Sequence, residues 1–550
     1  MNKESIVIYI SMFVMGGCGL AYEYTMSRVA SDLLGNSVRQ WAIIIGVMMF
    51  FMGVGSDAQK YLKERRLIDK FILAEIILGL LGGFGPIAMM YTFGVHQGYY
   101  ILVQYAFIST IGLLIGFEIP LLIRINQAYT SELKINLGGV LKMDYIGALC
   151  GALVWIFLLP KFFTLIESAF VLGILNVMVG GFTLYYFRRL AKWRIRLSFF
   201  TICCLISLSY GLVMAKNWTS HAEQWLYRDR IVFSETTPYQ HIVITESRSN
   251  DIYCYINGHL QFSGADEFIY HENLVHPAFA IAPRHKNILI LGGGDGMALR
   301  EVLKYQDVES VVLCDIDPMM TQLAQKNSYF TRLNNNSLAN SRLTILTNHA
   351  LLESGEDRLL VPDQRTRFQR RTEESVKIKI INMDAAKFVE QISGMYDIII
   401  MDFPDPSTPE LAKLYSTVFY HHVAQKLSAE GIMTQQSTSP VHAEEAFLCI
   451  GRTMTQSGLA VVPYHDNIPS FGEWGWWIGG RNNLYSKEKI RKLIIDIDRF
   501  EVMTRYLTPE LVKASIQFGK NQLFTKFDDI NVLADTRLYD YYLTAWKREY

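Results

Sequence analysis

The stretch that decides the fold of this chain runs from residue 288 to residue 300 and reads ILILGGGDGMALR. Its four leading aliphatic residues predict a strand that is buried on both faces of a sheet. The four glycines and one Asp that follow predict a tight turn, and residues 298–304 predict the start of a helix. This order is typical of the first unit of a nucleotide-binding α/β sheet, in which Gly292 and Gly294 let the backbone approach a ligand.

The downstream sequence supports this interpretation. Residues 311–314 form a second apolar run that ends in Asp315, 20 residues after Asp295. An acid at that position usually accepts hydrogen bonds from the hydroxyls of a ribose. Further buried strands are predicted at 342–346, 378–382, 397–401 and 431–436. Because these strands alternate with helical stretches, segment 284–550 is predicted to form a Rossmann-like, methyltransferase-type, doubly wound parallel sheet.

Composition separates this segment from the beginning of the chain. Half of the residues are hydrophobic and 19% are charged, against about a quarter charged in soluble proteins. The net charge is zero, which gives no indication of a nucleic-acid partner. The seven cysteines form no CxxC pair. We therefore interpret them as small apolar core residues and predict neither a disulfide framework nor a metal site.

Residues 1–215 hold the apolar excess. They contain seven apolar segments of about 20 residues or more, the length that crosses a bilayer. The approximate spans are 5–27, 40–57, 70–94, 99–123, 140–160, 164–187 and 197–215. The first is too long and too polar at its end for a cleavable signal peptide. We predict a multi-pass helical bundle in the cell membrane, followed by a polar linker at 216–229.

One acid inside these spans is a candidate functional group. Glu118 stands in the sequence GFEIP, deep in the fourth span and next to a helix-breaking proline. Ionisable residues at membrane depth are costly and are often functional. We predict that Glu118 binds a cation within the bundle; the alternative is an acid that only pairs with other polar groups there.

Residues 230–283 are predicted to form a small antiparallel β subdomain and a connecting helix. Alternating apolar runs occur at 241–245, 252–256 and 260–262. Asn-Asp and Asn-Gly pairs between them are typical of hairpin turns. Asp266 is expected to be the N-cap of a helix that ends near Ala282.

Four acids are expected to meet at one edge of the predicted sheet. Asp295, Asp315, Asp384 and Asp402 follow predicted strands or lie in the turns directly after them. Ligands of such sheets bind beyond the carboxyl ends of the strands. Several carboxylates in one crevice repel each other unless something positive lies between them. A ligand with several amino groups would suit such a crevice, whereas a row of helix caps would explain only one or two of the acids.

Specific motifs from about residue 250 to 480 resemble the spermidine synthase family of aminopropyltransferases. The matching residues are Gln261, the run DEFIYHE at 266–272, the glycine turn 292–296 with Arg300 and Glu301, DID at 315–317, Asp384, and DFPDPSTP at 402–409. The whole chain is similar to the membrane-bound members, which carry an amino-terminal bundle. The resemblance implies transfer of an aminopropyl group from decarboxylated S-adenosylmethionine to a diamine, usually putrescine, with methylthioadenosine as the by-product and no permanently bound cofactor.

The resemblance also implies roles for individual residues. Asp402 would be the general base at the attacking amine, and Asp295 would meet the amine of the donor. The diamine would be held by Asp405, His271 and Tyr270. Asp315 would hold the ribose hydroxyls. The methylthioadenosine site would be lined by Gln261, Gly292, Gly294, Asp384, Ala385 and Pro409.

The chain departs from the family pattern at several places. Phe403-Pro404 replaces a small hydroxyl pair between the two acids of the 402–409 motif, and Met297 and Ala385 replace glycines. Phe471 stands where soluble members have a tyrosine near the attacking amine, and Glu473 or Trp474 is a candidate to compensate for the lost hydroxyl. These changes bear on the identity of the acceptor more than on the reaction.

Two other functions fit the same sequence. A methyltransferase can use the same sheet, and a polyamine-binding sensor or transporter can carry a degenerate enzyme domain; a dehydrogenase fits less well, since no motif at a strand end suits hydride transfer. The soluble relatives assemble as dimers or tetramers, so the resemblance allows a homo-oligomer. The expected partners are a diamine and the lipid bilayer.

The sequence gives conflicting indications of the side of the membrane on which the catalytic half lies. Basic residues gather in the loops after the second and sixth spans, which predicts a cytoplasmic amino terminus and, with seven spans, an external carboxy-terminal half. The donor, however, is made in the cytoplasm. We expect the catalytic half to be cytoplasmic because the donor is available there, although the distribution of basic residues in the loops predicts the opposite side. An Arg-rich segment at 347–376 is expected to be a solvated loop, or else to contact anionic lipid.

Overall fold

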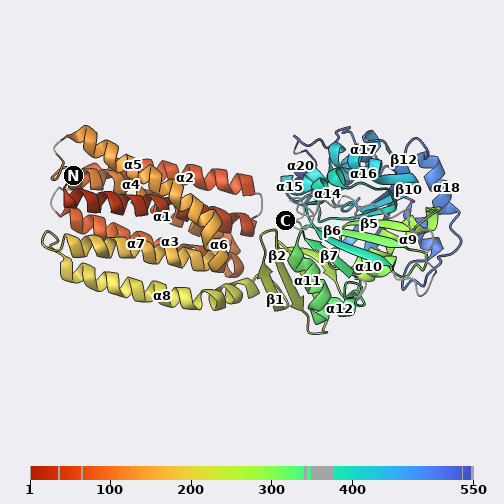
Figure 1. Cartoon of the computed structure of the whole chain (residues 1–550), viewed down its shortest axis with the longest axis horizontal. Coiled ribbons are helices and arrows are strands. Elements are labelled where there is room, and N and C mark those ends of the chain that lie inside the picture. The colour runs from red at the N-terminus through yellow and green to blue at the C-terminus, as the bar shows by residue number, and fades with distance from the viewer. Residues whose placement is uncertain are drawn as a thin grey trace. The chain divides into compact units, whose positions relative to one another are not determined.

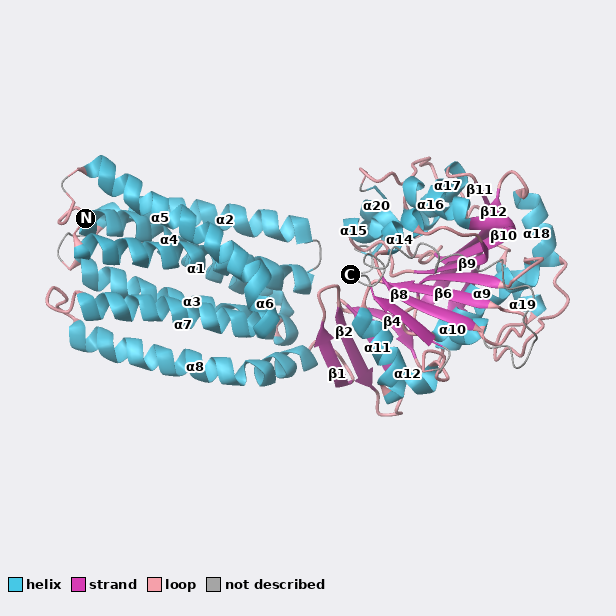
Figure 2. Cartoon of the chain, viewed as in Figure 1, coloured by secondary structure: helices cyan, strands magenta, loops and turns pink. Residues whose placement is uncertain are grey.

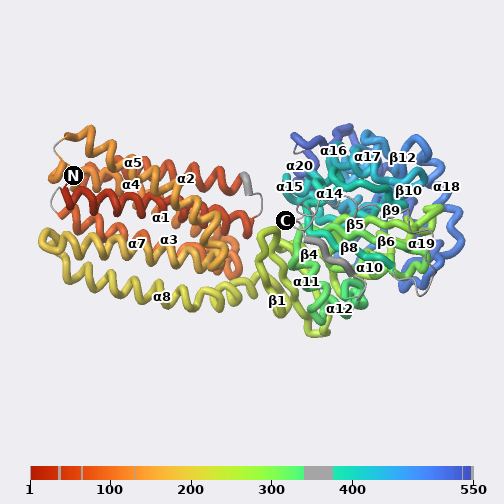
Figure 3. The backbone as a smooth tube through the Cα atoms, viewed as in Figure 1, coloured from red at the N-terminus to blue at the C-terminus, as the bar shows by residue number. Residues whose placement is uncertain are grey.

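The structure is a computed structural model that describes residues 2–34, 37–62, 66–130, 132–339, 343–347, 376–535 and 537–546. The chain divides into two compact units, Met1–Arg230 and Ile231–Tyr550, which are described separately below (Figure 3). Residues 348–375 fall outside the described ranges, and so does nearly all of the Arg-rich segment that was expected to be a loop.

The first unit is a bundle of long helices (Figure 1). They are α1 (Lys3–Leu34), α2 (Ser37–Ala58), α3 (Leu67–Val95), α4 (Tyr100–Asn126), α5 (Leu133–Leu153), α7 (Leu165–Tyr186) and α8 (Arg194–Gln224). A π-helical segment and the short helix α6 (Leu159–Phe162) extend α5. Among the residues that the structure describes, seven helices are long and apolar enough to cross a membrane by length and composition, the number that the sequence predicts.

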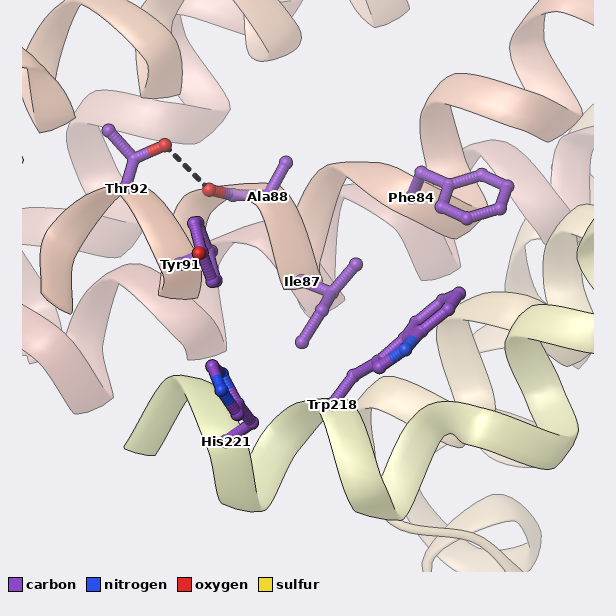
Figure 4. Close-up of a pocket in the computed structure, with 7 residues that line it drawn as sticks. All are labelled: Phe84, Ile87, Ala88, Tyr91, Thr92, Trp218 and His221. Atoms are coloured by element: carbon purple, nitrogen blue, oxygen red, sulfur yellow. Dashed lines mark hydrogen bonds between the residues drawn. The ribbon is translucent and has the colours of Figure 1, made fainter. Parts of the chain in front are cut away.

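Small residues let the helices of the bundle pack closely. A Cβ atom on Gly151 of α5 would lie 2.5 Å from the Cα of Gly17 on α1, and one on Gly147 would overlap the carbonyl oxygen of Phe13. Backbones can approach this closely only where side chains are absent. Between α3 and α8 the bundle instead leaves a cavity of 420 Å³, which Tyr91, Trp218 and His221 help to line (Figure 4).

Polar side chains meet inside the bundle around the predicted cation-binding residue. Glu118 is 2% exposed, and Glu75 and Asn176 are fully buried. The Asn176 amide donates to Glu75 Oε2 at 2.8 Å. The Tyr22 hydroxyl is buried, and it makes no hydrogen bond to any described residue. Glu118 lies close enough to Glu75 to interact with it electrostatically, and its binding of a cation stays a prediction.

The predicted linker at 216–229 is largely helical. Helix α8 continues to Gln224, well beyond the expected end of the seventh span. Residues 212–224 contain neither glycine nor proline, so nothing in them stops the helix where its apolar pattern fades.

The second unit begins with a four-stranded sheet in the order β1-β2-β3-β4. The strands are β1 (Arg230–Thr236), β2 (His241–Glu246), β3 (Ile252–Ile256) and β4 (His259–Ser263), of which β1 was not predicted. The β2–β3 and β3–β4 pairs are antiparallel. Asn257 and Gly258 both have positive φ, as the predicted Asn-Gly hairpin requires. Helix α9 (Glu267–Ile281) follows.

Within the described part of the chain, the large sheet has eight strands in the order β11-β12-β10-β9-β5-β6-β8-β7 (Figure 2). The six predicted strands are confirmed as β5 (Asn287–Gly292), β6 (Ser310–Asp315), β7 (Leu343–Thr347), β8 (Lys377–Asn382), β9 (Tyr396–Asp402) and β10 (Leu427–Gln436). The predicted strands are parallel to their neighbours, and the structure adds two strands at one edge that were not predicted. There, β11 (Leu459–Ile468) and β12 (Gly472–Arg481) form an antiparallel hairpin, and β12 is antiparallel to β10. The loop between them is too short for the crossover that a parallel pair needs.

Helices cover both faces of this sheet. Besides α9, the helices of this unit are α10 (Met297–Val302), α11 (Pro318–Lys326), α12 (Ser328–Leu333), α14 (Ala385–Gln391), α15 (Pro409–Ala412), α16 (Thr417–Lys426), α17 (Glu444–Gln456), α18 (Lys487–Ile495), α19 (Pro509–Ser515) and α20 (Arg537–Trp546). In β5, Ile288 and Ile290 join one hydrophobic core, and Leu289 and Leu291 join the other. Successive side chains of a strand point to opposite faces, so an unbroken aliphatic run serves both cores.

The three central strands end side by side. Gly292 of β5 pairs with Asp402 of β9, and Leu291 pairs with Cys314, the residue before Asp315 on β6. The glycine turn therefore leaves the sheet between two of the predicted acids.

Candidate active site

Gly292 and Gly294 have no room for side chains, because the backbone of Asp402 and the carboxylate of Asp315 lie against them. A Cβ on Gly294 would lie 2.5 Å from Asp315 Oδ2, and one on Gly292 would overlap the carbonyl oxygen of Asp402. Gly292 also has a φ of 80°, which disfavours other residues. At these two glycines the turn thus leaves the backbone uncovered by side chains at the carboxyl ends of β5, β6 and β9.

Asp315 is held by the backbone around it. Its Oδ2 accepts a hydrogen bond from the Gly294 amide at 3.0 Å, and Oδ1 accepts one from the Asp317 amide at 2.8 Å. Burial raises the pKa of Asp315 to about 7, although both backbone bonds favour the ionised form. Each oxygen retains a lone pair that can accept from a ligand hydroxyl.

Three functional groups meet beside the turn. One ring nitrogen of His271 and one carboxylate oxygen each of Asp295 and Asp402 lie within 4.8 Å of one another. The Tyr270 hydroxyl donates to Asp402 Oδ1 at 2.6 Å, while His271 Nε2 lies 4.0 Å from Oδ2. Such a group could hold a metal ion or an ammonium, since both are attracted by carboxylates.

His271 owes its charge to a neighbour on its own helix. Its Nδ1 lies 2.8 Å from Glu267 Oε2, and Arg300 donates to both oxygens of Glu267, at 2.8 and 3.0 Å. Burial opposes protonation of the imidazole, but the Glu267 hydrogen bond and the nearby carboxylates raise the pKa of His271 to about 9. The site therefore carries an imidazolium opposite Asp402 at neutral pH.

Asp402 is poised to take up a proton. Burial raises its pKa to about 6, the charge of His271 lowers it, Asp295 raises it, and the Tyr270 hydrogen bond lowers it. An acid with this pKa is mostly ionised at pH 7, and it still has a higher proton affinity than a solvent-exposed aspartate.

Asp405 lies three residues further along the same loop. Its Oδ1 is buried and makes no hydrogen bond to a described residue. Burial raises the pKa of Asp405 to about 6, while the side chains of Thr438, Gln436 and Tyr542 favour the ionised form. Thr438 has a φ of 60°, a strained conformation for a β-branched residue. Such strain is often found at functional sites.

Ring packing and hydrogen bonds hold the loop between Asp402 and Asp405 in place. Phe403 is buried against Phe419, with ring centroids 5.7 Å apart, and its carbonyl oxygen accepts from the Gln436 amide. The Tyr415 hydroxyl donates to the carbonyl oxygen of Pro404 at 2.9 Å. Phe403 and Pro404 thus anchor the loop and leave Asp402 and Asp405 as its acidic side chains.

The residues predicted for the nucleoside end are more dispersed. Asp384 caps α14 by accepting from the Ala386 amide at 2.9 Å, and it pairs with Lys413 Nζ at 2.5 Å. Ala385 and Pro409 are the first residues of α14 and α15. Gln261, on β4, donates to the His259 carbonyl at 3.2 Å; among the described residues it makes no hydrogen bond to the acids.

Comparison with known proteins identifies the family. The chain is 35% identical over 544 residues to a polyamine aminopropyltransferase of Leptospira interrogans, which covers 98% of this chain and 99% of the relative. The chain belongs to the polyamine aminopropyltransferase family. It is a transferase of polyamine biosynthesis, as the resemblance of its motifs to spermidine synthases predicts.

A second relative of this aminopropyltransferase also matches nearly the whole chain, and a solved structure matches about half of it. The polyamine aminopropyltransferase of Oceanobacillus iheyensis is 34% identical over 553 residues, which covers 99% of this chain and 98% of that protein. A spermidine synthase from Thermotoga maritima is similar in structure with a TM-score of 0.41 and 22% identity, over 54% of this chain and 87% of that one. The spermine/spermidine synthase domain profile matches residues 267–351 and 364–488.

Phe471 differs from the family pattern, and the structure narrows the residues that could replace its missing hydroxyl. Its ring lies 6.4 Å from that of Tyr270 and 5.0 Å from that of Trp474. Glu473 is paired with His465. The Trp474 indole nitrogen is buried and has no hydrogen-bond partner among the described residues. Trp474, unlike Glu473, therefore keeps a polar group free among the described residues, and its ring lies beside that of Phe471.

Some contacts of the aminopropyltransferase site could not be read from the sequence. Asp266 was expected to cap α9, but its side chain makes no capping bond. It accepts instead from the Ser470 amide at 2.7 Å and the Ser470 hydroxyl at 2.9 Å, which fixes the turn that carries Phe471. The Lys413 contact was also missed, since no motif links Lys413 to Asp384.

Proposed function

We propose that this aminopropyltransferase transfers the aminopropyl group of decarboxylated S-adenosylmethionine to putrescine, giving spermidine and methylthioadenosine. The proposal rests chiefly on one observation. A ring nitrogen of His271 and one carboxylate oxygen each of Asp295 and Asp402 lie within 4.8 Å of one another beside the glycine turn. A cationic donor and a cationic acceptor both need carboxylates, and two carboxylates this close to each other need positive charge.

Asp402 is the base in this proposal. Putrescine arrives as a diammonium, and its attacking nitrogen must lose a proton before it becomes a nucleophile. Asp402 accepts that proton through Oδ2, because Oδ1 already accepts from Tyr270. A positioned base of this kind contributes about 10²–10⁴-fold to the rate.

The transfer itself needs no further acid. The free amine attacks the carbon next to the sulfonium, a C–N bond forms, and the C–S bond breaks with its electron pair moving to sulfur. The sulfonium becomes a neutral thioether, so the leaving group requires no proton. Alignment of nitrogen, carbon and sulfur supplies most of the remaining acceleration.

His271 balances the charge of the site before the substrates bind. Its imidazolium lies 4.0 Å from Asp402, where a bound ammonium would also be attracted. Arrival of a diammonium brings positive charge near the imidazolium and favours release of its proton. We infer that His271 is cationic in the free enzyme and neutral when the diamine is bound.

The donor is recognised at both of its ends. Asp295 meets the ammonium of the aminopropyl group, and it would repel the carboxylate of ordinary S-adenosylmethionine. Asp315, whose oxygens face the glycine turn, accepts from the ribose hydroxyls. Asp384, Ala385, Pro409 and Gln261 line the methylthioadenosine site in this proposal.

A product assay tests the function. Purified full-length protein, incubated with decarboxylated S-adenosylmethionine and putrescine, should release methylthioadenosine and spermidine in equal amounts. Formation of S-adenosylhomocysteine from S-adenosylmethionine, without methylthioadenosine, would show a methyltransferase instead. The Asp402→Asn variant should lose turnover and retain donor binding; unchanged turnover would exclude Asp402 as the base.

We further propose that the bundle spans the cell membrane and that the catalytic unit is cytoplasmic. The seven apolar helices support the first statement, and the cytoplasmic supply of the donor supports the second. A reporter fused after Tyr550 distinguishes the two sides. Alkaline phosphatase activity of that fusion would place the catalytic unit outside.

A further inference from the structure

The tip of the β11–β12 hairpin is tied to the start of helix α9. The side chain of Asp266, the residue before α9, is only 7% exposed and makes no capping bond to the helix. Its Oδ2 accepts from the Ser470 amide at 2.7 Å, and its Oδ1 accepts from the Ser470 hydroxyl at 2.9 Å. Both oxygens of a buried carboxylate therefore bind a single residue of the turn at 469–471.

Backbone contacts also fix the shape of this turn. Ile468 and Gly472 pair with each other at the ends of β11 and β12, and the Phe471 amide donates to the Ile468 carbonyl oxygen at 2.9 Å. Gly472 has a φ of 80°, which disfavours other residues. The amides of Ser470 and Phe471 are thus both anchored, and the position of the Phe471 ring follows from these two bonds.

The Phe471 ring is part of the packing around Tyr270. The centroid of the Tyr270 ring lies 6.4 Å from that of Phe471 and 5.8 Å from that of the buried Trp476. Rings packed in this way limit rotation of the tyrosine, whose hydroxyl donates to Asp402 Oδ1 at 2.6 Å. Asp266 precedes Tyr270 by four residues, so the same end of α9 provides both the anchor of the turn and the ring against which the turn packs.

We propose that Asp266 and Ser470 are positioning residues for the acceptor, and that they act through Phe471, which they hold against Tyr270. The inference rests on the proposed function, because it takes Asp402 as the place where the acceptor amine binds. With both bonds to Ser470 in place, the Phe471 ring forms one wall of the acceptor site. Without them the turn shifts and the wall is lost, whereas the glycine turn, where the donor would bind, is held by other contacts.

Graded variants of the full-length protein test the inference. Asp266→Ala removes both bonds, so KM for putrescine should rise about 10-fold. Ser470→Ala removes the hydroxyl bond and keeps the amide bond, so a rise of about 3-fold is expected. Ser470→Thr retains both donors and should stay within about two-fold of the wild type. In all three variants KM for the donor should stay within about two-fold, and kcat should change less than KM for putrescine, because the base stays in place.

A double-mutant cycle tests whether the pair acts through Phe471. In the Phe471→Ala background the wall is already missing, so the addition of Ser470→Ala should raise KM for putrescine no further. If Ser470→Ala still raises that KM by about 3-fold in the absence of the ring, the two residues act independently and the inference is overturned. The Ser470 variants decide the question even where Asp266→Ala fails to fold.

Ser249→Ala is the matched control, because the Ser249 hydroxyl also donates to an aspartate, Asp251 Oδ2 at 2.7 Å, in the turn between β2 and β3 of the other sheet. It should leave both KM values unchanged. An unchanged putrescine KM in Ser470→Ala, or an equal rise in the KM values of both substrates, would overturn the inference. Wild-type protein that forms no spermidine at all would overturn the proposed function instead, so the two failures are distinguishable.

Discussion

Tyr270→Phe should move the pH at which the enzyme becomes active. The Tyr270 hydroxyl donates to Asp402 Oδ1 at 2.6 Å, a short bond to a group whose side chain is 9% exposed. This bond favours the carboxylate and lowers the pKa of Asp402, which burial raises to about 6. Removal of the hydroxyl must therefore raise that pKa.

The size of the change follows from the strength of the bond. Hydrogen bonds to charged groups contribute about 1.5–3 kcal/mol, and 1.36 kcal/mol corresponds to one pKa unit. The acid limb of kcat/KM for putrescine should thus move up by about 1 to 2 pH units, from near pH 6 to between about pH 7 and 8. Activity on the alkaline side should fall much less than activity at pH 6.

The assay is release of methylthioadenosine by purified protein between pH 5 and pH 9. Tyr506→Phe is a suitable control, because its hydroxyl donates to Asp466, an acid outside the proposed site, at 3.1 Å. An acid limb that stays in place, or moves to lower pH, in Tyr270→Phe would refute the assignment of Asp402 as the titrating base. An equal shift in both variants would do the same.

Three further predictions concern other parts of the chain. Asp315→Asn should raise KM for the donor about 10-fold, through loss of charged hydrogen bonds to the ribose, and leave KM for putrescine unchanged; steady-state kinetics with each substrate varied will show whether the effect is confined to the donor. Phe471→Tyr should restore a hydroxyl close to Tyr270 and lower KM for putrescine several-fold, and an unchanged or higher KM would count against Phe471 as an acceptor-site residue. Glu118→Gln should alter polyamine handling by cells or the level of functional protein, measured by polyamine content, immunoblotting and activity; no change in any of these would contradict a role for Glu118 in cation binding.

The sequence predicts the central strands well, because burial on both faces demands an unbroken aliphatic run. Residues 288–291 and 398–401 are unbroken apolar runs, and both lie in the middle of the sheet. The antiparallel edge was not foreseen. Strand β12 reads GEWGWWIGGR, whose glycines and tryptophans do not follow a strand pattern. Its strand conformation comes from its pairing with β10 and β11.

The site was predictable only where a motif carries it. The glycine turn, Asp315 and the two acids of the 402–409 loop lie at the strand ends that their positions in the sequence indicate. Long-range contacts were not predictable. Asp266 has the residue type and position of a helix cap, but it bonds to Ser470, about 200 residues away. Glu272 likewise accepts from the amides of residues 505–507, about 230 residues away.

The most direct test of this account is an experimental structure of the full-length protein with methylthioadenosine and putrescine bound. We expect the ribose on Asp315, one amine of putrescine within hydrogen-bond distance of Asp402, about 2.6–3.2 Å, and the other amine on Asp405 Oδ1. The attacking amine should point towards the sulfur of methylthioadenosine. A nucleoside bound away from the glycine turn, or a putrescine whose amines contact neither Asp402 nor Asp405, would contradict it.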